Sequence, residues 1–336
     1  MAAAALNSVV VVGGSLAGWR AVETLRAEKF EGTITLVGAE RHLPYDRPPL
    51  SKQILAGTWP PEKAVLADRK RSSELRVIEV LGHQAVRLDV EGRQVEIDDG
   101  TVLSADAVVV ATGASPRHLP GTEGLGPRDG LFTLRTLDDS LALRDALTAV
   151  ESARVVVIGA GFIGAEVAST CAGLDCQVTV LEVMDIPLSN VLGPVIGAHC
   201  GSLHGAHGVE LRTGVGVAGV RRGEGSGLLV ELADGDVLSA DVVVVGIGVV
   251  PSTGWLDGSG LNLDNGVVCD DRLFAAEGIV AAGDLARWSW RHDGGEERIR
   301  IEHWEVAAGA GVAAARSVLA GRDEAPSFTP IPYFWS

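Results

Sequence analysis

The stretch Gly159-Ala-Gly161-Phe-Ile-Gly164 has the residue types and the spacing of a dinucleotide-binding loop. It follows an apolar run at 154–158, which predicts a buried strand, and it opens a stretch at 161–172 with helical periodicity. The first glycine permits a tight turn, the second lets the backbone approach a pyrophosphate, and the third lets the helix pack closely on the strand. The N-terminus of the helix offers N–H groups and a partial positive charge to the phosphates. The candidate NAD-binding residues of this loop are Gly159, Gly161, Phe162, Ile163 and Gly164.

A carboxylate after the next predicted strand sets the expected choice of cofactor. Glu182 follows the apolar run 177–181 and lies 18 residues beyond Gly164. A carboxylate at this place hydrogen-bonds the ribose hydroxyls and repels the 2′-phosphate of NADPH. The sequence therefore predicts that Glu182 binds the ribose and that NADH is preferred over NADPH.

A second, less regular glycine loop lies near the N-terminus, at 13–18. It follows a predicted strand at 8–13 and precedes a predicted helix at 16–28. Ser15 stands where the middle glycine of the motif belongs, so its Cβ narrows the approach of the backbone, although its hydroxyl could itself bond a phosphate. Glu40 supplies the ribose carboxylate after another predicted strand. The candidate residues of this site are Gly13, Ser15, Ala17, Gly18 and Glu40.

The two loops begin 146 residues apart and indicate an internal duplication of one nucleotide-binding design. We therefore expect an α/β protein with two doubly wound, Rossmann-like dinucleotide-binding domains. Two dinucleotide sites in one chain suggest electron transfer between two bound cofactors.

The composition indicates a folded protein that is not built to bind nucleic acid. Of 336 residues, 46% are hydrophobic and 21% are charged, and the length suggests about two domains. Lys and Arg number 28 against 44 Asp and Glu, a net charge of −16, whereas duplex-binding proteins have basic surfaces. The N-terminus lacks the basic segment of a signal peptide, and no stretch of 18 uncharged apolar residues suggests a membrane span. We expect a cytoplasmic protein with neither nucleic acid nor a membrane as partner.

Seven short segments outside the glycine loops resemble those of one family. They are Tyr45–Lys52 (Y-D-R-P-P-L-S-K), Ala111–Ala114 (A-T-G-A), Leu134–Leu137 (L-R-T-L), Val243–Pro251, Ala281–Asp284 (A-A-G-D), Glu302–Trp304 (E-H-W) and Tyr333–Ser336 (Y-F-W-S). From about residue 8 to residue 336 the chain resembles the FAD-dependent, NADH-using ferredoxin reductases of oxygenase systems. This is the putidaredoxin reductase type, within the pyridine nucleotide-disulfide oxidoreductase superfamily.

The resemblance implies that FAD binds to the N-terminal glycine loop, with Glu40 on the adenosine ribose. Arg47 and Lys52 would reach the pyrophosphate and the isoalloxazine region. Asp284 would hold the ribityl chain, and Trp304 would stand at the pyrimidine edge of the flavin. The other implied FAD contacts are Ala85 through its backbone, Thr112, Gly113, Arg135, Gly283 and Trp335.

On the nicotinamide side, the resemblance implies that Glu166 pairs with Lys52 beneath the flavin. These two residues form the expected catalytic environment, but no acid or base is required because hydride moves directly between the cofactors. Gly246 and Gly248 complete the implied NAD contacts. No metal site is expected.

The cysteines predict neither a disulfide scaffold nor a redox disulfide. Four cysteines are few for a chain of this length. Cys171 and Cys176 fall at the end of the helix after the second glycine loop, whereas disulfide reductases have their pair near the flavin or in a C-x-x-C loop. We expect inert buried thiols.

The resemblance also implies a glutathione-reductase-like domain order. We expect a discontinuous FAD domain at 1–118 and 250–325 with an NAD domain inserted at 119–249. Residues 326–336 would begin a third, C-terminal α/β domain that is missing or truncated, because the family continues past this point.

The implied function is that of an NADH-dependent reductase. Electrons would pass through FAD to a small, acidic 2Fe-2S ferredoxin that supplies a monooxygenase or a Rieske dioxygenase. Two alternatives stay open: a reductase for rubredoxin or another acceptor, such as a quinone, and an NADH-dependent redox sensor of the apoptosis-inducing-factor type. The oligomeric state is left open.

Overall fold

Runs of valine form the central strands of two parallel sheets, one in each of the two units into which the chain divides. The computed structural model describes residues 6–223, 227–292 and 294–330. The first unit takes the described residues within Met1–Asp46, Val65–Ser115 and Val250–Ser336, and the second takes those within Arg47–Ala64 and Pro116–Val249. The predicted FAD and NAD domains and their boundaries stay a prediction. The predicted domain start at 326–336 lies outside the described residues from 331 onward.

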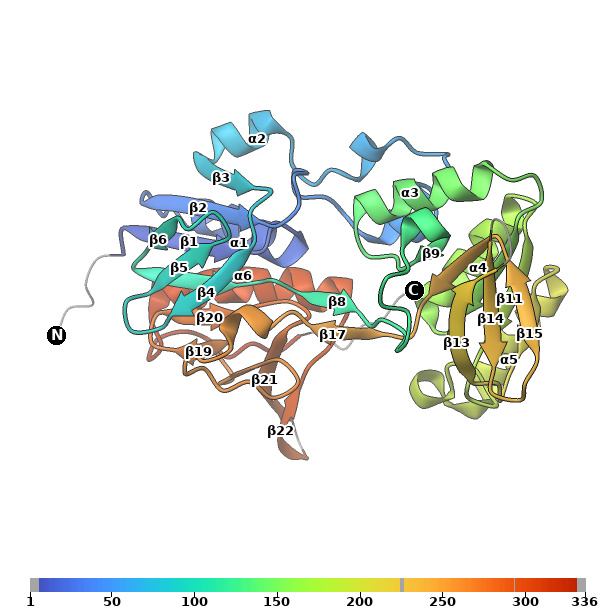
Figure 1. Cartoon of the computed structure of the whole chain (residues 1–336). Helices are drawn as coiled ribbons and strands as arrows, with labels where there is room; N and C mark the ends of the chain where they lie inside the picture. The colour runs from blue at the N-terminus through green and yellow to red at the C-terminus, as the bar shows by residue number, and fades with distance from the viewer. Residues whose placement is uncertain (1–5, 224–226, 293, 331–336) are drawn as a thin grey trace. The chain divides into compact units, whose positions relative to one another are not determined.

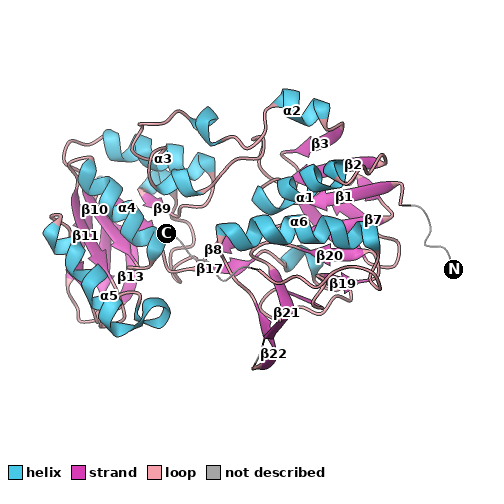
Figure 2. Cartoon of the chain, turned by 180° about the vertical axis from the view of Figure 1, so that it is seen from behind, coloured by secondary structure: helices cyan, strands magenta, loops and turns pink. Residues whose placement is uncertain are grey.

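The sheet of the first unit has its strand order reversal beside β1. Its order is β19-β20-β7-β1-β2-β3, parallel except for the antiparallel pair of β19 and β20. Figure 1 labels these strands except β7, and Figure 2 labels all of them. The chain runs from β1 outward through β2 and β3, and later strands add on the other side through β7. The bounds are β1 Ser8–Val12, β2 Thr33–Gly38, β3 Val77–Leu81, β7 Ala107–Val110, β19 Phe274–Ala276 and β20 Ile279–Ala281.

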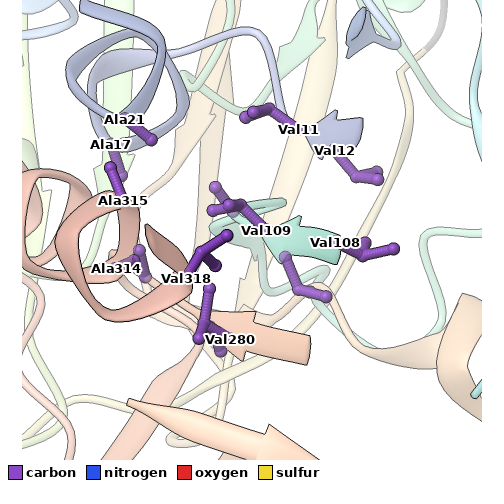
Figure 3. Packing of buried hydrophobic residues seen from close by; sticks show 14 of the residues in the cluster. Val11, Val12, Ala17, Ala21, Val108, Val109, Val280, Ala314, Ala315 and Val318 are labelled. Carbon is purple, nitrogen blue, oxygen red and sulfur yellow. The ribbon is translucent and has the colours of Figure 1, made fainter. Parts of the chain in front are cut away.

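Two helices, α1 (Leu16–Ala27) and α6 (Trp304–Ala320), lie side by side and cover one face of this sheet (Figure 2). Small side chains occupy their contact, and alanines of both helices gather above the valines of β7 and β20 (Figure 3). A Cβ added at Gly311 of α6 would lie 2.2 Å from the carbonyl oxygen of Ala17 in α1. The close approach of the helices therefore depends on this glycine.

The remaining elements of the first unit are small sheets and one short helix. The antiparallel sheet β4-β5-β6 comprises Ala85–Asp89, Gln94–Ile97 and Val102–Ser104. The sheet β18-β21-β22 comprises Val267–Cys269, Ala286–His292 and Gly295–Ile299. Helix α2 is Arg69–Glu74 and η4 is Gly254–Leu256. The paired strands β8 (Ala114–Pro116) and β17 (Val249–Pro251) each contain residues of both units.

The second unit is built on the parallel sheet β12-β11-β10-β16-β9, with its strand order reversal beside β10. The strands are β9 Leu131–Phe132, β10 Arg154–Ile158, β11 Gln177–Leu181, β12 Glu210–Arg212 and β16 Val242–Val245. The helices are α3 Leu137–Thr148, α4 Phe162–Gly173 and α5 Ser189–Ala206, with the 3-10 turns η1 Pro48–Ser51, η2 Pro61–Ala64 and η3 Pro127–Asp129. The meander β13-β14-β15 comprises Val217–Arg222, Leu228–Leu232 and Val237–Ala240.

Strand β10 is a valine run because both of its faces are buried. Val155 and Val157 pack in one cluster with side chains of α3 and α4. Val156 and Ile158 pack in another cluster with side chains of the meander. Apolar residues at successive positions, rather than alternate ones, follow from this two-sided cover.

The predicted fold class is confirmed, since each unit has a parallel sheet in which a glycine loop joins the first strand of a βαβ unit to its helix. Helix α5 was not predicted. Four glycines and Pro194 lie within it, and Gly193 breaks it with a φ of 76°. Such a composition disfavours a helix by intrinsic propensity, so only the tertiary context reveals it.

Replacing Gly311 tests the approach of α1 and α6. Gly311→Ala should lower the free energy of unfolding by about 1–3 kcal/mol, because the new methyl meets backbone rather than a side chain that can move. Gly309→Ala is the matched control on the same helix, since its Cβ would lie 3.6 Å from the Phe328 ring, an ordinary contact. The control should be neutral or gain up to about 1 kcal/mol. Equal losses in chemical denaturation would contradict the proposed contact.

Candidate functional site

The first glycine loop is shaped by close contacts between backbone atoms. Gly13 has a φ of 126°, and a Cβ there would lie 2.1 Å from the carbonyl oxygen of Ala111, just after β7. A Cβ at Gly18 would lie 1.9 Å from the carbonyl oxygen of Gly13. Both positions therefore require glycine. At Gly13 the chain leaves β1 close to the end of β7, and at Gly18 helix α1 packs against the loop.

The second glycine loop repeats these contacts in the other unit. Gly159 has a φ of 103°, and its Cβ would lie 2.4 Å from the carbonyl oxygen of Gly246, just after β16. A Cβ at Gly164 would lie 2.0 Å from the carbonyl oxygen of Gly159. The two loops thus share one backbone design, placed in each sheet where the strand order reverses and where nucleotides bind in such folds.

The middle position of the second loop is different, because a Cβ there would meet no protein atom. Around Gly161, nothing lies within 4 Å of the Cβ position, and the backbone is in an extended conformation open to any residue. Ser15 takes the equivalent place, as the N-cap of α1, just as Gly161 is the N-cap of α4. What a glycine preserves here is therefore space for a ligand, and the fold itself tolerates Ser15.

The N-termini of α1 and α4 are suited to bind phosphate. Neither N-cap residue caps its helix with a side-chain hydrogen bond, and neither helix has an acidic residue in its first turn. The first-turn N–H groups and the helix dipole favour an anion at such a terminus. Both loops therefore fit the pyrophosphate of a dinucleotide.

Glu182 is buried and tied to the second glycine loop. Its Oε2 accepts a hydrogen bond from the backbone N–H of Ala160 at 2.7 Å, and its Oε1 accepts one from the N–H of Met184 at 2.9 Å. Only 9% of the residue is exposed. These bonds hold the carboxylate beside the loop in one orientation, and each oxygen keeps a second lone pair for a ligand. The contact of Glu182 with a ribose stays a prediction.

Glu40 takes the corresponding place after β2. Its carboxylate accepts a hydrogen bond of 2.5 Å from the hydroxyl of the buried Tyr45. An open polar pocket of about 430 Å³ begins at the next residue along the chain. It is lined by Arg41 after β2, by Glu79, Leu81, Gly82 and His83 in and just after β3, and by Arg69 at the start of α2. The first unit therefore has room for a nucleoside beside the predicted ribose carboxylate.

In the second unit, the structure brings together the predicted pair of Lys52 and Glu166. The Lys52 Nζ lies 2.7 Å from Oε2 of Glu166 and donates to the carbonyl oxygen of Pro48 at 3.2 Å. The hydroxyl of Ser51 donates to the same Oε2 at 2.5 Å. Glu166 lies one turn into α4, directly after the glycine loop. The Lys52–Glu166 ion pair is therefore held on α4, the helix whose N-terminus is suited to bind phosphate.

Other predicted FAD contacts already have partners within their own units. Arg47 donates to the carbonyl oxygen of Arg135. The hydroxyl of Thr112 donates to the carbonyl oxygen of Ser252 at 2.8 Å. The indole N–H of Trp304 donates to Asp46 at 2.6 Å. These contacts fix the side chains, while their roles toward FAD stay predictions.

The remaining predicted residues lie at turns and strand ends. Gly113 follows β7 with a φ of 68°, and Gly283 follows β20 with a φ of 78°. A Cβ at Gly283 would lie 3.1 Å from the Cβ of Ala17, so the β20 end touches the start of α1. Asp284 comes next, Ala85 begins β4, and Gly248 follows β16 with a φ of 93°. Trp335 lies outside the described residues.

Sequence reasoning missed three residues that hold predicted site residues in place. They are Ser51, the partner of Glu166, Asp46, the partner of Trp304, and Tyr45, the partner of Glu40. All three lie in Tyr45–Lys52, the segment that first suggested the family. Its polar residues other than Arg47 and Lys52 were the available signal.

The cysteines are free thiols rather than a redox pair. Burial, and next the neighbouring Cys176, raises the pKa of the Cys171 thiol to about 12. Burial also raises the pKa of the half-buried Cys176. Among the described residues, no three His, Cys, Asp or Glu side chains gather as a metal site. Within the same residues, no helix has the length and apolar character needed to cross a membrane.

These features define a two-dinucleotide flavoprotein fold, and the chain belongs to the pyridine nucleotide-disulphide oxidoreductase family, whose model matches residues 7–311. It is 38% identical over 335 residues to the ferredoxin–NAD(+) reductase subunit of the benzene 1,2-dioxygenase system of Pseudomonas putida, covering 98% of this chain and 78% of that protein. It is 37% identical over 331 residues to rhodocoxin reductase of Rhodococcus erythropolis, covering 98% of this chain and 75% of the relative.

A solved structure is similar over nearly the whole chain. The putidaredoxin reductase in its covalent complex with putidaredoxin matches with a TM-score of 0.91 and 34% identity, over 99% of this chain and 79% of that chain. The resemblance to this type of reductase, expected from seven short segments, is therefore confirmed.

The two outer glycines and the middle glycine of the second loop should respond differently to a methyl group. Gly161→Ala should lower the free energy of unfolding by no more than about 1 kcal/mol, the cost of a poorer N-cap residue, because its Cβ meets nothing in the protein. It should weaken NADH binding about tenfold, since the methyl takes space needed by the pyrophosphate. Gly164→Ala should lose both stability and binding. Calorimetric titration with NADH and chemical denaturation measure the two effects, and unchanged affinity in Gly161→Ala would contradict the assignment.

The Cys171 thiol should be inert in the folded protein. With a pKa of about 12, its thiolate amounts to about one part in ten thousand at pH 8, and the thiolate is the reactive form. Ellman's reagent at pH 8 should therefore modify Cys171 only after denaturation, as read by mass spectrometry. The half-buried Cys200 is the internal comparison. Prompt modification of native Cys171 would show that the helix end opens.

Proposed function

We propose that the protein is an NADH-dependent flavoprotein reductase that passes electrons through FAD to a small 2Fe-2S ferredoxin of an oxygenase system. The observation that carries the proposal is the repeated glycine loop with its Lys52–Glu166 pair, in a chain whose relatives are ferredoxin reductases. Such an activity needs two nucleotide sites, and each unit has the backbone geometry of one.

The first unit holds FAD. Its glycine loop and the N-terminus of α1 bind the pyrophosphate, and Glu40 binds the adenosine ribose beside the cavity at the ends of β2 and β3. When bound, FAD accepts the two electrons of a hydride and releases them singly, which matches a two-electron donor to a one-electron acceptor. Asp284 and Trp304 contribute the polar and aromatic contacts that the family resemblance implies.

The second unit holds NADH. The uncapped N-terminus of α4 binds the pyrophosphate, and the fixed carboxylate of Glu182 binds the ribose hydroxyls. Glu182 also excludes a 2′-phosphate, because a second negative charge would meet a buried carboxylate whose oxygens cannot turn away. NADH is therefore the substrate rather than NADPH.

Lys52 and Glu166 set the electrostatics of the reaction. Lys52 provides a cation that stabilises negative charge arising during reduction, and Glu166 keeps that cation in place. Neither residue has to gain or lose a proton in hydride transfer, so their task is positioning and charge balance. We place the reaction in the cytoplasm, as the sequence predicts.

The partner is a small 2Fe-2S ferredoxin. Both the benzene 1,2-dioxygenase relative, which is a ferredoxin–NAD(+) reductase subunit, and the covalent complex of putidaredoxin reductase with putidaredoxin support this choice. The ferredoxin in turn supplies a monooxygenase or a Rieske dioxygenase.

Anaerobic titration of the purified full chain tests the two nucleotide assignments. The protein loaded with FAD should lose its yellow colour on addition of NADH, and NADH should be favoured over NADPH by at least about tenfold, because of Glu182. Reduction of a 2Fe-2S ferredoxin, followed by its visible spectrum, then tests the acceptor.

Several outcomes would contradict the proposal. A protein that stays colourless in the presence of FAD would remove the flavin site. Reduction of rubredoxin or a quinone, but of no ferredoxin, would assign another acceptor. Slow turnover together with NADH-dependent dimerisation would favour a redox sensor.

A further inference from the structure

The turn that presents Lys52 is clamped to two helices by buried hydroxyl groups. The hydroxyl of Ser140, on α3, donates to the carbonyl oxygen of Leu50 at 2.7 Å. The hydroxyl of Thr170, on α4, donates to the carbonyl oxygen of Ser51 at 2.7 Å. Thr170 lies one helical turn beyond Glu166. The backbone of η1 is therefore held independently of any side chain in η1 itself.

Within this clamped turn, Ser51 and Lys52 bind one oxygen of Glu166. The Ser51 hydroxyl lies 2.5 Å from Oε2 and the Lys52 Nζ lies 2.7 Å from the same atom. Ser51 is 3% exposed, whereas 37% of the Lys52 side chain is exposed. The hydroxyl is thus a short, buried donor on a fixed backbone, and the ammonium is a mobile donor on a long side chain that water can reach.

Glu166 has little else to hold its carboxylate. It is the only charged residue of α4, and the Thr170 hydroxyl on the same helix face is directed to the carbonyl oxygen of Ser51 rather than to the carboxylate. A carboxylate with Lys52 as its sole anchor could follow the ammonium through several rotamers. The Ser51 hydroxyl, a second donor on a rigid turn, favours one rotamer of Glu166. The carboxylate then attracts the Lys52 ammonium to one place.

We propose that Ser51 is a positioning residue, which orients the Glu166 carboxylate so that the Lys52 ammonium is held in one place. The proposal deepens the proposed function and rests on it, since it concerns the same pair of charges. Ser51 acts through Glu166 and not on a cofactor. Its removal should therefore release Lys52 while leaving the turn clamped by Ser140 and Thr170.

The test compares the accessibility of the Lys52 amine in holoprotein variants. Limited acetylation with acetic anhydride, read by mass spectrometry, measures the labelling rate of Lys52 relative to that of Lys70, whose side chain is 83% exposed. Ser51→Ala should raise this ratio by roughly threefold to tenfold, because a hydrogen bond to a charged group is lost. Ser140→Ala is the matched control: it removes another buried serine hydroxyl from the same clamp without touching Glu166, and should leave the ratio unchanged.

A double-mutant cycle separates positioning from general loosening. Glu166→Gln alone should raise the Lys52 ratio at least as much as Ser51→Ala, and adding Ser51→Ala to Glu166→Gln should have no further effect. Additive effects, or an equal rise in Ser140→Ala, would overturn the proposal in favour of a merely structural hydroxyl. An unchanged ratio in Ser51→Ala would overturn it outright.

A kinetic readout connects the labelling to the reaction. In stopped-flow reduction by NADH, Ser51→Ala should slow flavin reduction by about threefold to tenfold with an unchanged flavin content, and Ser51→Thr, which keeps the hydroxyl, should recover part of the rate. Because labelling needs no turnover, a released Lys52 in a protein that does not oxidise NADH would retain the positioning role and reject the proposed function. Normal labelling with normal turnover would reject the positioning role alone.

Discussion

The structure of each unit depends on one steric constraint: at the start of each glycine loop the backbone passes so close to a neighbouring carbonyl oxygen that no side chain fits there. At Gly13 and Gly159, a Cβ would come within 2.1 and 2.4 Å of a carbonyl oxygen that follows the adjacent strand. The loop can leave the sheet only between those two strands, and the next glycine then seats the helix against it. Helix direction, exposed N–H groups and the place of a phosphate all follow from this contact.

The two glycine loops share the outer glycines but differ at the middle position of the motif. The outer glycines are retained in both units because protein atoms forbid any side chain there. The middle position is Gly161 in one unit and Ser15 in the other. A Cβ built on Gly161 would have no protein atom within 4 Å, so the backbone there does not require glycine. The packing of the protein therefore restricts the outer positions to glycine, whereas it leaves the middle position of the second loop open. Ser15 is the point at which the two sites can differ in what they bind.

Local pattern in the sequence was sufficient for the two sheets and the two loops, because valine runs, glycine spacing and helical periodicity are read within about 30 residues. It could not show which polar residues meet. Ser51 and Glu166 are 115 positions apart, and Asp46 and Trp304 are 258 apart. Such contacts depend on how strands are ordered in a sheet, which no local period encodes. Helix α5, rich in glycine, was missed for the opposite reason: its local signal disfavours the structure that tertiary packing imposes.

Both glycine loops are suited to bind anions without a basic side chain of their own, which is how an acidic chain can offer two dinucleotide sites. Neither 13–18 nor 159–164 contains Lys or Arg, so what these loops themselves offer a phosphate is backbone N–H groups and helix dipoles. Cations are then available for other tasks. Lys52 is paired with Glu166, the single charge of α4, so the two charges balance each other within the protein. Under the proposed function, the Lys52 ammonium, held by Glu166, can therefore act on the charge that develops during electron transfer.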